Sequence, residues 1–173
     1  MKVELIAPLN RMDSNMWGHY FRIPDEVALQ FTKGKDRRVL CTLNNKETIH
    51  CALMPSPQGY FIMINQSLRR KLKLSLGDAV KLEIEKDTSE YGMNICEEFE
   101  AVILEDDEVK PYFEGLTKGR QRSLLYLVGK IKNSEVRINR AMAIAHYLKV
   151  DKGVIDYKRL NEVIKEFNQK NRL

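Results

Sequence analysis

Apolar and polar residues alternate in several short stretches of the first ninety residues. A period of two places the apolar side chains of a strand on one face, and these stretches are rich in β-branched and aromatic residues. They predict six strands, at residues 2–7, 17–23, 37–43, 47–53, 60–64 and 79–85. Between the third and fourth strands, Asn44 and Asn45 predict a two-residue hairpin turn, because asparagine tolerates the positive φ that such turns need.

Two short helices are expected between these strands. Residues 24–29 begin with a proline followed by two acids, and residues 65–72 begin with an asparagine that suits a helix cap. The series strand, helix, strand follows Tyr20-Phe21 and again follows Tyr60-Phe61, with a period of about forty residues. A true repeat would let two halves close on each other as a small barrel within one chain. A chance similarity of pattern is the alternative.

The second half of the chain changes to helical spacing. Residues 123–131 and 135–148 both carry apolar stripes, and Ser134 is the expected cap of the second helix. Asp156 is the expected cap of a third helix, and Gly153 marks the joint before it. The predicted fold class is therefore α+β, with a barrel domain at residues 1–90 and a helical region at residues 91–173.

Composition places the chain among globular proteins. Its 173 residues are 43% hydrophobic and 31% charged, and no apolar run reaches the length of a membrane-spanning helix. The N-terminus lacks the features of a secretory signal. Three cysteines without CxxC spacing suit a reducing compartment, so a cytoplasmic location is expected.

Charge is distributed unevenly around the net value of +5. Residues 87–114 contain ten acids and a single base, Lys110, whereas the flanking segments are basic. The favoured interpretation is that this acidic segment packs beside the basic C-terminal segment and is neutralised there. An exposed acidic surface for a ligand is the alternative.

Catalytic and metal-binding patterns are not found in the sequence. The three histidines are scattered, and no histidine and cysteine stand at the spacing of metal ligands. There is no GxSxG motif, no glycine-rich phosphate loop and no cysteine with an activating neighbour. We therefore expect no catalytic residues, no metal and no cofactor, and predict a protein that is not an enzyme. The alternative is an enzyme whose pocket no sequence motif reveals.

Basic clusters are the strongest functional signal in the sequence. Arg137 and Arg140 lie three residues apart on a helix, near its start, where the helix dipole disfavours cations. They are expected to face an anion, either an acidic side chain of residues 97–108 or an external ligand. The candidate ligand- or partner-binding residues are Arg120, Arg122, Lys132, Arg137 and Arg140, and the candidate nucleic-acid-binding residues are Arg69, Arg70, Lys71 and Lys73. The alternative is that these basic residues lie on a solvated face and bind no ligand.

Residues 64–84, with a short helix, Gly77-Asp78 and then an alternating strand, resemble the swapped-hairpin motif of the AbrB and MazE class of bacterial regulators and antitoxins. In that class two chains each contribute half of a barrel, and the dimer binds DNA. Here both halves are expected in one chain, which predicts an AbrB-like barrel formed within a monomer.

A second resemblance covers roughly residues 2–148. Residues 51–61, followed by the helix at Asn65 and by Gly77-Asp78, resemble a bacterial barrel domain of unknown function that often precedes a YdeI/OmpD-associated segment. Residues 116–140 resemble that segment, although Ile131 and Val136 stand where the family usually has alanine and threonine. The resemblance implies a double-split β-barrel with a helical region and no established catalysis. The family label speaks of bacteriocin resistance and of association with a porin, and residues 149–173 lie outside it.

Two functions follow as hypotheses. The first is a cytoplasmic, non-catalytic binding module that engages a protein or an anionic ligand through the basic helical surface. The second is a nucleic-acid-binding regulator of the AbrB/MazE type, with weak DNA binding, because a fused barrel loses the dimer symmetry that reads paired half-sites. Aromatic platforms for single-stranded nucleic acid are not visibly interleaved with the basic clusters. No insertion into a membrane is expected.

Overall fold

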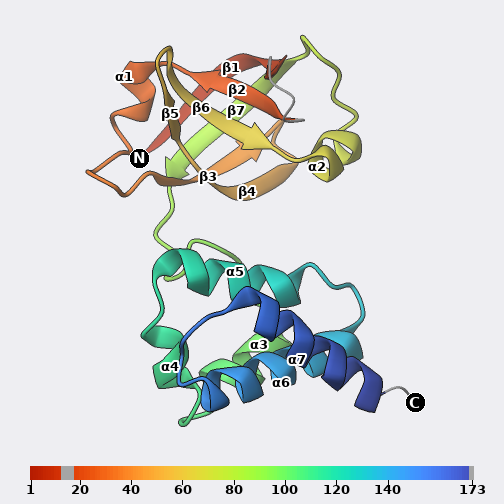
Figure 1. The fold of residues 1–173 in the computed structure, drawn as a ribbon. Helices are drawn as coiled ribbons and strands as arrows, with labels where there is room; N and C mark the ends of the chain where they lie inside the picture. Colours follow the sequence, from red (N-terminus) through yellow and green to blue (C-terminus); the bar gives the residue numbers. More distant parts are fainter. Residues whose placement is uncertain (13–17, 172–173) are drawn as a thin grey trace. The chain divides into compact units, whose positions relative to one another are not determined.

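The computed structural model describes residues 1–12 and 18–171, which form two compact units, Met1–Gly92 and Met93–Leu173. The first unit is a curled antiparallel sheet with two short helices (Figure 1). Its elements are β1 (Lys2–Arg11), β2 (His19–Ile23), α1 (Asp25–Ala28), β3 (Arg38–Leu43), β4 (Glu47–Ala52), β5 (Met54–Ser56), β6 (Gly59–Ile64), α2 (Gln66–Lys71) and β7 (Ala79–Lys86). The second unit is entirely helical.

The sheet has the order β4-β3-β7-β1-β2-β6-β5, and every pairing is antiparallel. The outermost strands β4 and β5 are separated in the chain by Leu53 alone, so the sheet curls until its two edges meet in one bent stretch. The pairing is also symmetric. The long strand β1 pairs with β7 through its first part and with β2 through its end. In the same way, the successive strands β4 and β5 pair with β3 and with β6. The α+β class with a barrel-like sheet and a helical region is thus confirmed.

Alternation along the strands builds the core of this unit. The longer strands send alternate side chains inward, as Phe21 and Ile23 do from β2 and Leu82 and Ile84 do from β7, and all four are buried. The remaining positions face outward. Because a slip of one residue would expose this whole set, the apolar pattern fixes the register of the sheet.

Local details differ from the predictions at two places. Asn44 and Asn45 have positive φ angles of 49° and 55°, as expected, but the loop contains three residues, because Leu43 pairs with Glu47. Strand β5 was not predicted, since all three of its residues are exposed and show no alternation. Trp17, the first residue of the predicted second strand, lies outside the described residues.

Helix α2 begins and ends through specific local contacts. The Asn65 side chain accepts a hydrogen bond from the backbone N–H of Leu68 at 2.8 Å, which confirms the predicted cap. At the other end Lys73 has a φ of 53°, and the N–H of Leu74 bonds to the carbonyl of Arg69 at 3.0 Å. This is the usual hydrogen-bond pattern at a helix C-terminus, with lysine where glycine is common.

The helical unit contains more helices than the sequence pattern indicated. They are α3 (Glu97–Phe99), the π-helical turn η1 (Glu100–Leu104), α4 (Lys110–Glu114), α5 (Lys118–Gly129), α6 (Ser134–Val150) and α7 (Tyr157–Lys170). The first three occupy the acidic segment, for which no helix was predicted. Asp156 caps α7 as expected, and Gly153 has a φ of 77° at the joint. The predicted cap Ser134 is wrong, because the side chain of Asn133 accepts the bond from Val136 instead.

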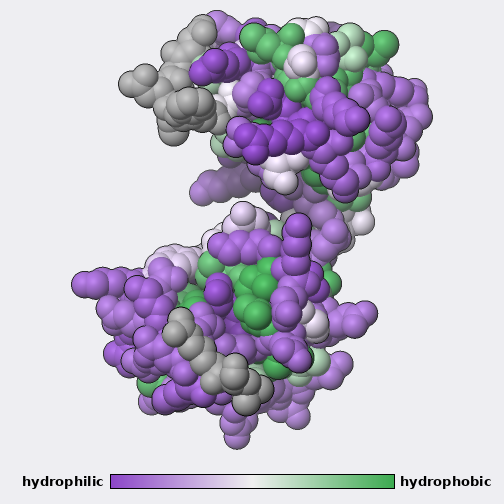
Figure 2. Space-filling model, turned by 90° about the vertical axis from the view of Figure 1, so that its right-hand side faces the viewer, coloured by the Kyte–Doolittle hydropathy of each residue, from purple (hydrophilic) through white to green (hydrophobic). Residues whose placement is uncertain are grey.

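The core of the helical unit joins the acidic segment to the longer helices. Phe99 of α3 and Phe113 of α4 meet edge to face, with ring centroids 5.2 Å apart. Leu124 of α5, Ile144 of α6 and Leu160 of α7 are completely buried. On the side shown in Figure 2, hydrophobic residues gather in the middle of this unit and hydrophilic residues surround them. None of its described helices is long and apolar enough to cross a membrane.

Candidate functional site

The outer surface of the curled sheet has two different halves. On the half formed by β1 and β7, charged side chains pair with each other: Lys2 lies 2.8 Å from Glu83, and Lys81 lies 3.0 Å from Glu4. Such a surface is typical of a sheet face in contact with water. Because the charged groups of these ion pairs neutralise each other, they do not indicate a ligand site.

The half formed by β2, β6 and β5 is apolar and aromatic instead. Tyr20 stands opposite Met63 in the register, and Phe61 stands opposite both Arg22 and Met54. Their neighbours along β2 and β6 are buried, so these five side chains lie on the outer face. Met54 and Met63 are 42% and 45% exposed. We call Tyr20, Arg22, Met54, Phe61 and Met63 the aromatic–arginine face.

A pocket of about 330 Å³ opens on this face. Tyr20 and Phe61 meet edge to face in its wall, with ring centroids 5.6 Å apart and planes inclined by 69°. Two arginines and no acidic residue are found among the described residues that line it, which are Arg11, Met12, Tyr20, Arg22, Ser56, Pro57, Gln58, Tyr60 and Phe61. The pocket therefore combines aromatic surface with positive charge, a chemistry that suits a flat anionic ligand.

The guanidinium group of Arg22 is held in place beside the pocket. It donates one hydrogen bond to the backbone carbonyl of Gln58 at 3.4 Å and another to the side-chain Oε1 of Gln58. Gln58 itself lies in the turn between β5 and β6, which is closed by the Ser56 hydroxyl donating to the carbonyl of Gly59 at 2.9 Å. Because the turn fixes the arginine, little side-chain entropy remains to be lost when an anion binds.

Positive charge continues from this pocket to α2. Arg11 and His19 are partners in the register of β1 and β2. Burial lowers the pKa of His19, and the positive charges of Arg69 and Arg11 lower it further. Arg69 of α2 therefore lies close enough to act electrostatically on His19 at the start of β2.

The rest of the α2 cluster is less concentrated than the sequence suggested. Lys71 forms an ion pair with Glu47 at 2.7 Å. Arg70 and Lys73 are exposed, whereas Arg69 is half-buried with its Nε lacking a hydrogen-bond partner. Of the four residues, Arg69 is the one whose charge acts on His19.

The basic residues of α6 are used inside the helical unit. Arg137 donates from Nε to the carbonyl of Ile131, and its Nη1 lies 3.5 Å from a carboxylate oxygen of Glu98. Arg140 donates to the carbonyl of Leu127 at 3.5 Å, and burial lowers its pKa. The expected anion for Arg137 is thus the acidic side chain of Glu98, and both arginines hold the end of α5 against α6.

The remaining residues of the predicted helical site are more scattered. Arg120 and Arg122 lie in the first turns of α5, and Arg120 is about 10 Å along the helix axis from Leu127, where Arg140 makes its contact. Lys132 is exposed in the connection between α5 and α6. The structure brings Arg137 and Arg140 together at the end of α5 but keeps Arg120 at its other end.

The acidic segment is partly neutralised by the basic C-terminal segment. Lys149 lies 2.7 Å from Glu108 and 3.4 Å from Asp106, in addition to the pair between Arg137 and Glu98. The hydroxyl of Ser134 also donates to Glu98 at 2.7 Å. These contacts confirm the favoured interpretation for three of the acids in the segment.

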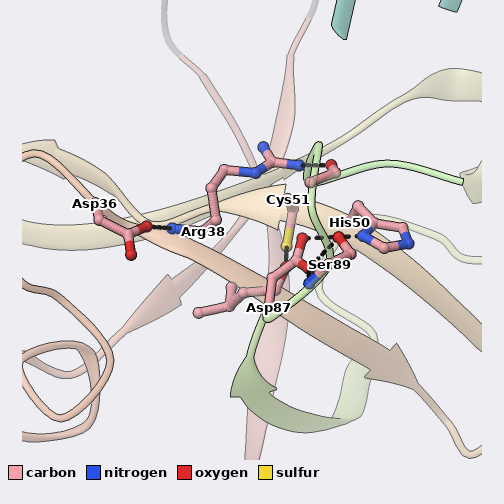
Figure 3. A network of polar contacts seen from close by, with 8 residues as sticks. Asp36, Arg38, His50, Cys51, Asp87 and Ser89 are labelled. Atoms are coloured by element: carbon pink, nitrogen blue, oxygen red, sulfur yellow. Dashed lines mark hydrogen bonds and ion pairs between the residues drawn. The ribbon is translucent and has the colours of Figure 1, made fainter. Parts of the chain in front are cut away.

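A second polar cluster of the barrel unit surrounds the buried carboxylate of Asp87 (Figure 3). His50 lies with Nδ1 2.9 Å from Oδ2, and Ser89 donates to Oδ1 from its backbone N–H and its hydroxyl. Burial raises the pKa of Asp87, but the hydrogen bonds from Ser89 and then from His50 outweigh it, so the pKa lies below its ordinary value. The carboxylate is therefore a stable anion at neutral pH.

This cluster lacks the nucleophile that would make it a catalytic triad on β4. Cys51 follows His50 on the strand but is buried on the opposite side, where its thiol faces the carbonyl of Val39 at 3.7 Å. The hydrogen bond with Cys51, together with burial, raises the pKa of the Cys41 thiol. Such thiols are not activated. Among the described residues, no group of histidine, cysteine and acidic side chains could hold a metal ion.

The aromatic–arginine face was not among the predicted sites. Tyr20 and Arg22 come from one strand and Phe61 and Met63 from another, so they are brought together only by the register of β2 and β6. A signal was present, because both strands carry large apolar residues at outward positions, where a solvated strand has polar ones.

Comparison with protein families supports the resemblance of the sequence to a barrel domain of unknown function followed by a YdeI/OmpD-associated segment. Residues 6–84 match the family model described as a domain of unknown function, DUF1905. Residues 93–149 match the model described as bacteriocin-protection, YdeI or OmpD-associated. A search of curated proteins found no match. The first match covers the curled sheet and the second covers α3 to α6, whereas α7 lies beyond both. The chain therefore carries a match to the DUF1905 domain over its curled sheet, followed by a match to the bacteriocin-protection, YdeI or OmpD-associated family over α3 to α6.

Proposed function

We propose that this protein is a non-catalytic binding module, and that the aromatic–arginine face of its barrel is the binding site for an anionic ligand with a flat, apolar part. The observation that carries this proposal is the contrast between the two halves of one sheet surface. Self-paired charges cover most of β1 and β7, where Ile6 is also exposed, whereas exposed methionines, two aromatic rings and a fixed arginine cover β2, β6 and β5. Exposed apolar groups on a sheet surface cost solubility, and a binding site is the usual reason for them.

The barrel face is a better ligand site than the end of α6. The guanidinium groups of Arg137 and Arg140 already bond to backbone carbonyls and to Glu98, so a ligand would have to replace internal contacts. Arg22, in contrast, is held by the backbone carbonyl and the side-chain amide of Gln58, which are neutral groups and do not compensate its positive charge. Ligand binding by Arg120, Arg122 and Lys132 stays a prediction.

The absence of catalysis and a cytoplasmic location belong to the same proposal. Asp87 orients His50, but the thiol next to this histidine points into the core. Cys41, Cys51 and Cys96 are free thiols, and Cys41 and Cys51 lie on neighbouring strands of the core, which suits a reducing compartment.

The proposal can be tested with simple probes and NMR spectroscopy of the full chain. We would titrate an aromatic sulfonate, a neutral aromatic alcohol and an aliphatic sulfonate, and follow the backbone amide signals. The aromatic sulfonate is expected to bind most tightly and to shift amides of β2 and β6. Arg22→Gln should weaken that binding, while the control Lys81→Gln, on the ion-paired half, should not.

Two results would contradict the proposal. One is an equal response to all three probes, since the face is proposed to need both the ring and the charge. The other is a set of shifted amides confined to the helical unit.

A further inference from the structure

The arrangement of rings and cations on this face also indicates the class of ligand. We propose that the face binds single-stranded nucleic acid, with an unpaired base against Tyr20 and Phe61 and the adjoining phosphates on Arg22 and Arg11. The inference rests on the proposed function, and it names the ligand of the same site.

The rings provide a surface on which a base can stack. Tyr20 and Phe61 come from neighbouring strands and support each other edge to face at 5.6 Å, so they are held in fixed orientations. Met54 and Met63 extend the apolar surface on the Phe61 and Tyr20 sides. A stacked base does not need specific hydrogen bonds, and such platforms on sheet surfaces are a common way to bind unpaired bases.

Two cations line the same pocket as the rings, where phosphates next to a stacked base would lie. Arg22 is fixed by the turn at Gln58, and Arg11 lines the same pocket. The two arginines come from β2 and β1, so the positive charge is spread over two strands instead of forming one point. A ligand with regularly spaced negative charges matches two separate cations of this kind.

The same geometry disfavours two other ligands. In a duplex the faces of the bases are covered by stacking, so Tyr20 and Phe61 would find no partner there. An acidic peptide could use Arg22 and Arg11, but short carboxylate side chains would leave the two rings without a matching surface. Unpaired bases joined by phosphates use both parts of the site.

Fluorescence anisotropy with labelled oligonucleotides of about ten nucleotides, a length within the usual site size of single-strand binders, tests the inference. Oligothymidylate, oligouridylate, a duplex and an oligoglutamate peptide would be compared on the full chain. We expect both single strands to bind and the duplex to bind at least about tenfold more weakly. Comparing thymidylate with uridylate shows whether DNA or RNA is preferred.

Variants separate stacking from charge. Phe61→Leu and Tyr20→Leu keep apolar volume but remove a ring, and each should weaken binding about tenfold, because one stacked base contributes about 1–3 kcal/mol. Arg22→Gln should lower the slope of log affinity against log salt by about 0.7, the value for one phosphate contact with a single strand. Tyr157→Leu and Lys81→Gln are the matched controls, an exposed tyrosine of α7 and an ion-paired lysine of β7.

The outcomes distinguish this inference from the proposed function. Absence of saturable oligonucleotide binding at about 50 mM salt, a low value at which phosphate contacts are strongest, would overturn it. So would equal affinity for the duplex, or tighter binding of oligoglutamate with no effect of either ring variant. If the aromatic sulfonate still shifts the amide signals of β2 and β6 in those cases, the proposed function stands and only the ligand class is wrong. Because Phe61 is part of the sheet, the amide spectrum of Phe61→Leu is checked first to show that this variant folds. If it does not fold, the result with Arg22→Gln decides whether the inference holds.

Discussion

Replacing Asp87 by asparagine should destabilise the barrel unit more than any comparable change of a surface acid. The carboxylate is fully buried, and it accepts three hydrogen bonds, two from Ser89 and one from the Nδ1 side of His50. Asparagine has nearly the same shape, so packing is preserved. It carries no charge, however, and one of its two polar atoms donates instead of accepting.

The expected loss is about 2–3 kcal/mol of unfolding free energy at neutral pH. A hydrogen bond to a charged group contributes about 1.5–3 kcal/mol, and the amide can retain the bonds on only one of the two carboxylate oxygens. Asp36→Asn is the matched control. Asp36 also forms an ion pair, with Lys86 at 2.8 Å, but its side chain is 56% exposed, so its removal should cost less than about 1 kcal/mol.

The destabilisation should depend on pH in one direction. The folded-state pKa of Asp87 is lowered, so its stabilising contribution is complete above the ordinary pKa of an aspartate, about 3.9, and is lost as the pH falls through the lower folded value. The difference between the wild type and Asp87→Asn should therefore be present at neutral pH and should shrink below about pH 4.

The suitable assay is urea unfolding monitored by hydrogen exchange with mass spectrometry, because peptides from β4 and β7 report on the barrel unit separately from the helical unit. If Asp87→Asn costs no more than Asp36→Asn, the buried carboxylate does not hold the end of β7, and our account of this cluster is refuted. A difference that grows below about pH 4 would refute the assigned direction of the pKa shift.

Four further expectations follow from single contacts. The double variant Arg137→Gln/Arg140→Gln should lose about 2 kcal/mol in urea unfolding of the helical unit, because carbonyls at the end of α5 lose their donors; unchanged stability would mean that both side chains are merely solvated. Tyr147→Phe should speed hydrogen exchange in α7, since the hydroxyl accepts from Asp156 at 2.8 Å; unchanged exchange would contradict this role. Lys73→Gly should stabilise α2 by up to about 1 kcal/mol in thermal melts, because it relieves a positive φ of 53°. Light scattering should give the monomer mass of 20.2 kDa, and a dimer that persists on dilution and does not form through the helices would contradict closure of the barrel within one chain.

The sequence was most informative where a pattern is local. Alternation located six strands because inward side chains such as Phe21 and Leu82 recur at every second position. Asn65 and Asp156 were identifiable as caps because a cap depends on residues at most three positions away. Asn133 and Ser134 show the limit of this signal. Both can cap a helix, and the hydrogen bond from Ser134 to Glu98, far away in the sequence, decides which one does.

Helices of the acidic segment were missed for a related reason. Between Glu97 and Glu114 the helical stretches are only three to five residues long, too short for an apolar stripe to become visible. Phe99 and Phe113 are buried by the contact between them and by α5 and α6, so tertiary packing stabilises these turns more than their own sequence does.

The position of the aromatic–arginine face depends on information that single strands do not contain. Tyr20 and Phe61 lie some forty positions apart in the chain, and a shift of one residue between β2 and β6 would send one ring into the core. The register is fixed from the inside, by Phe21 and Ile62, so the same inward pattern that was read correctly also determines which outward residues meet. Outward positions of paired strands should therefore be examined together once the core pattern is known. Here that comparison separates the ion pairs of β1 and β7 from the rings of β2 and β6, and it places Arg22 of the barrel, which no basic cluster in the sequence included, beside the pocket.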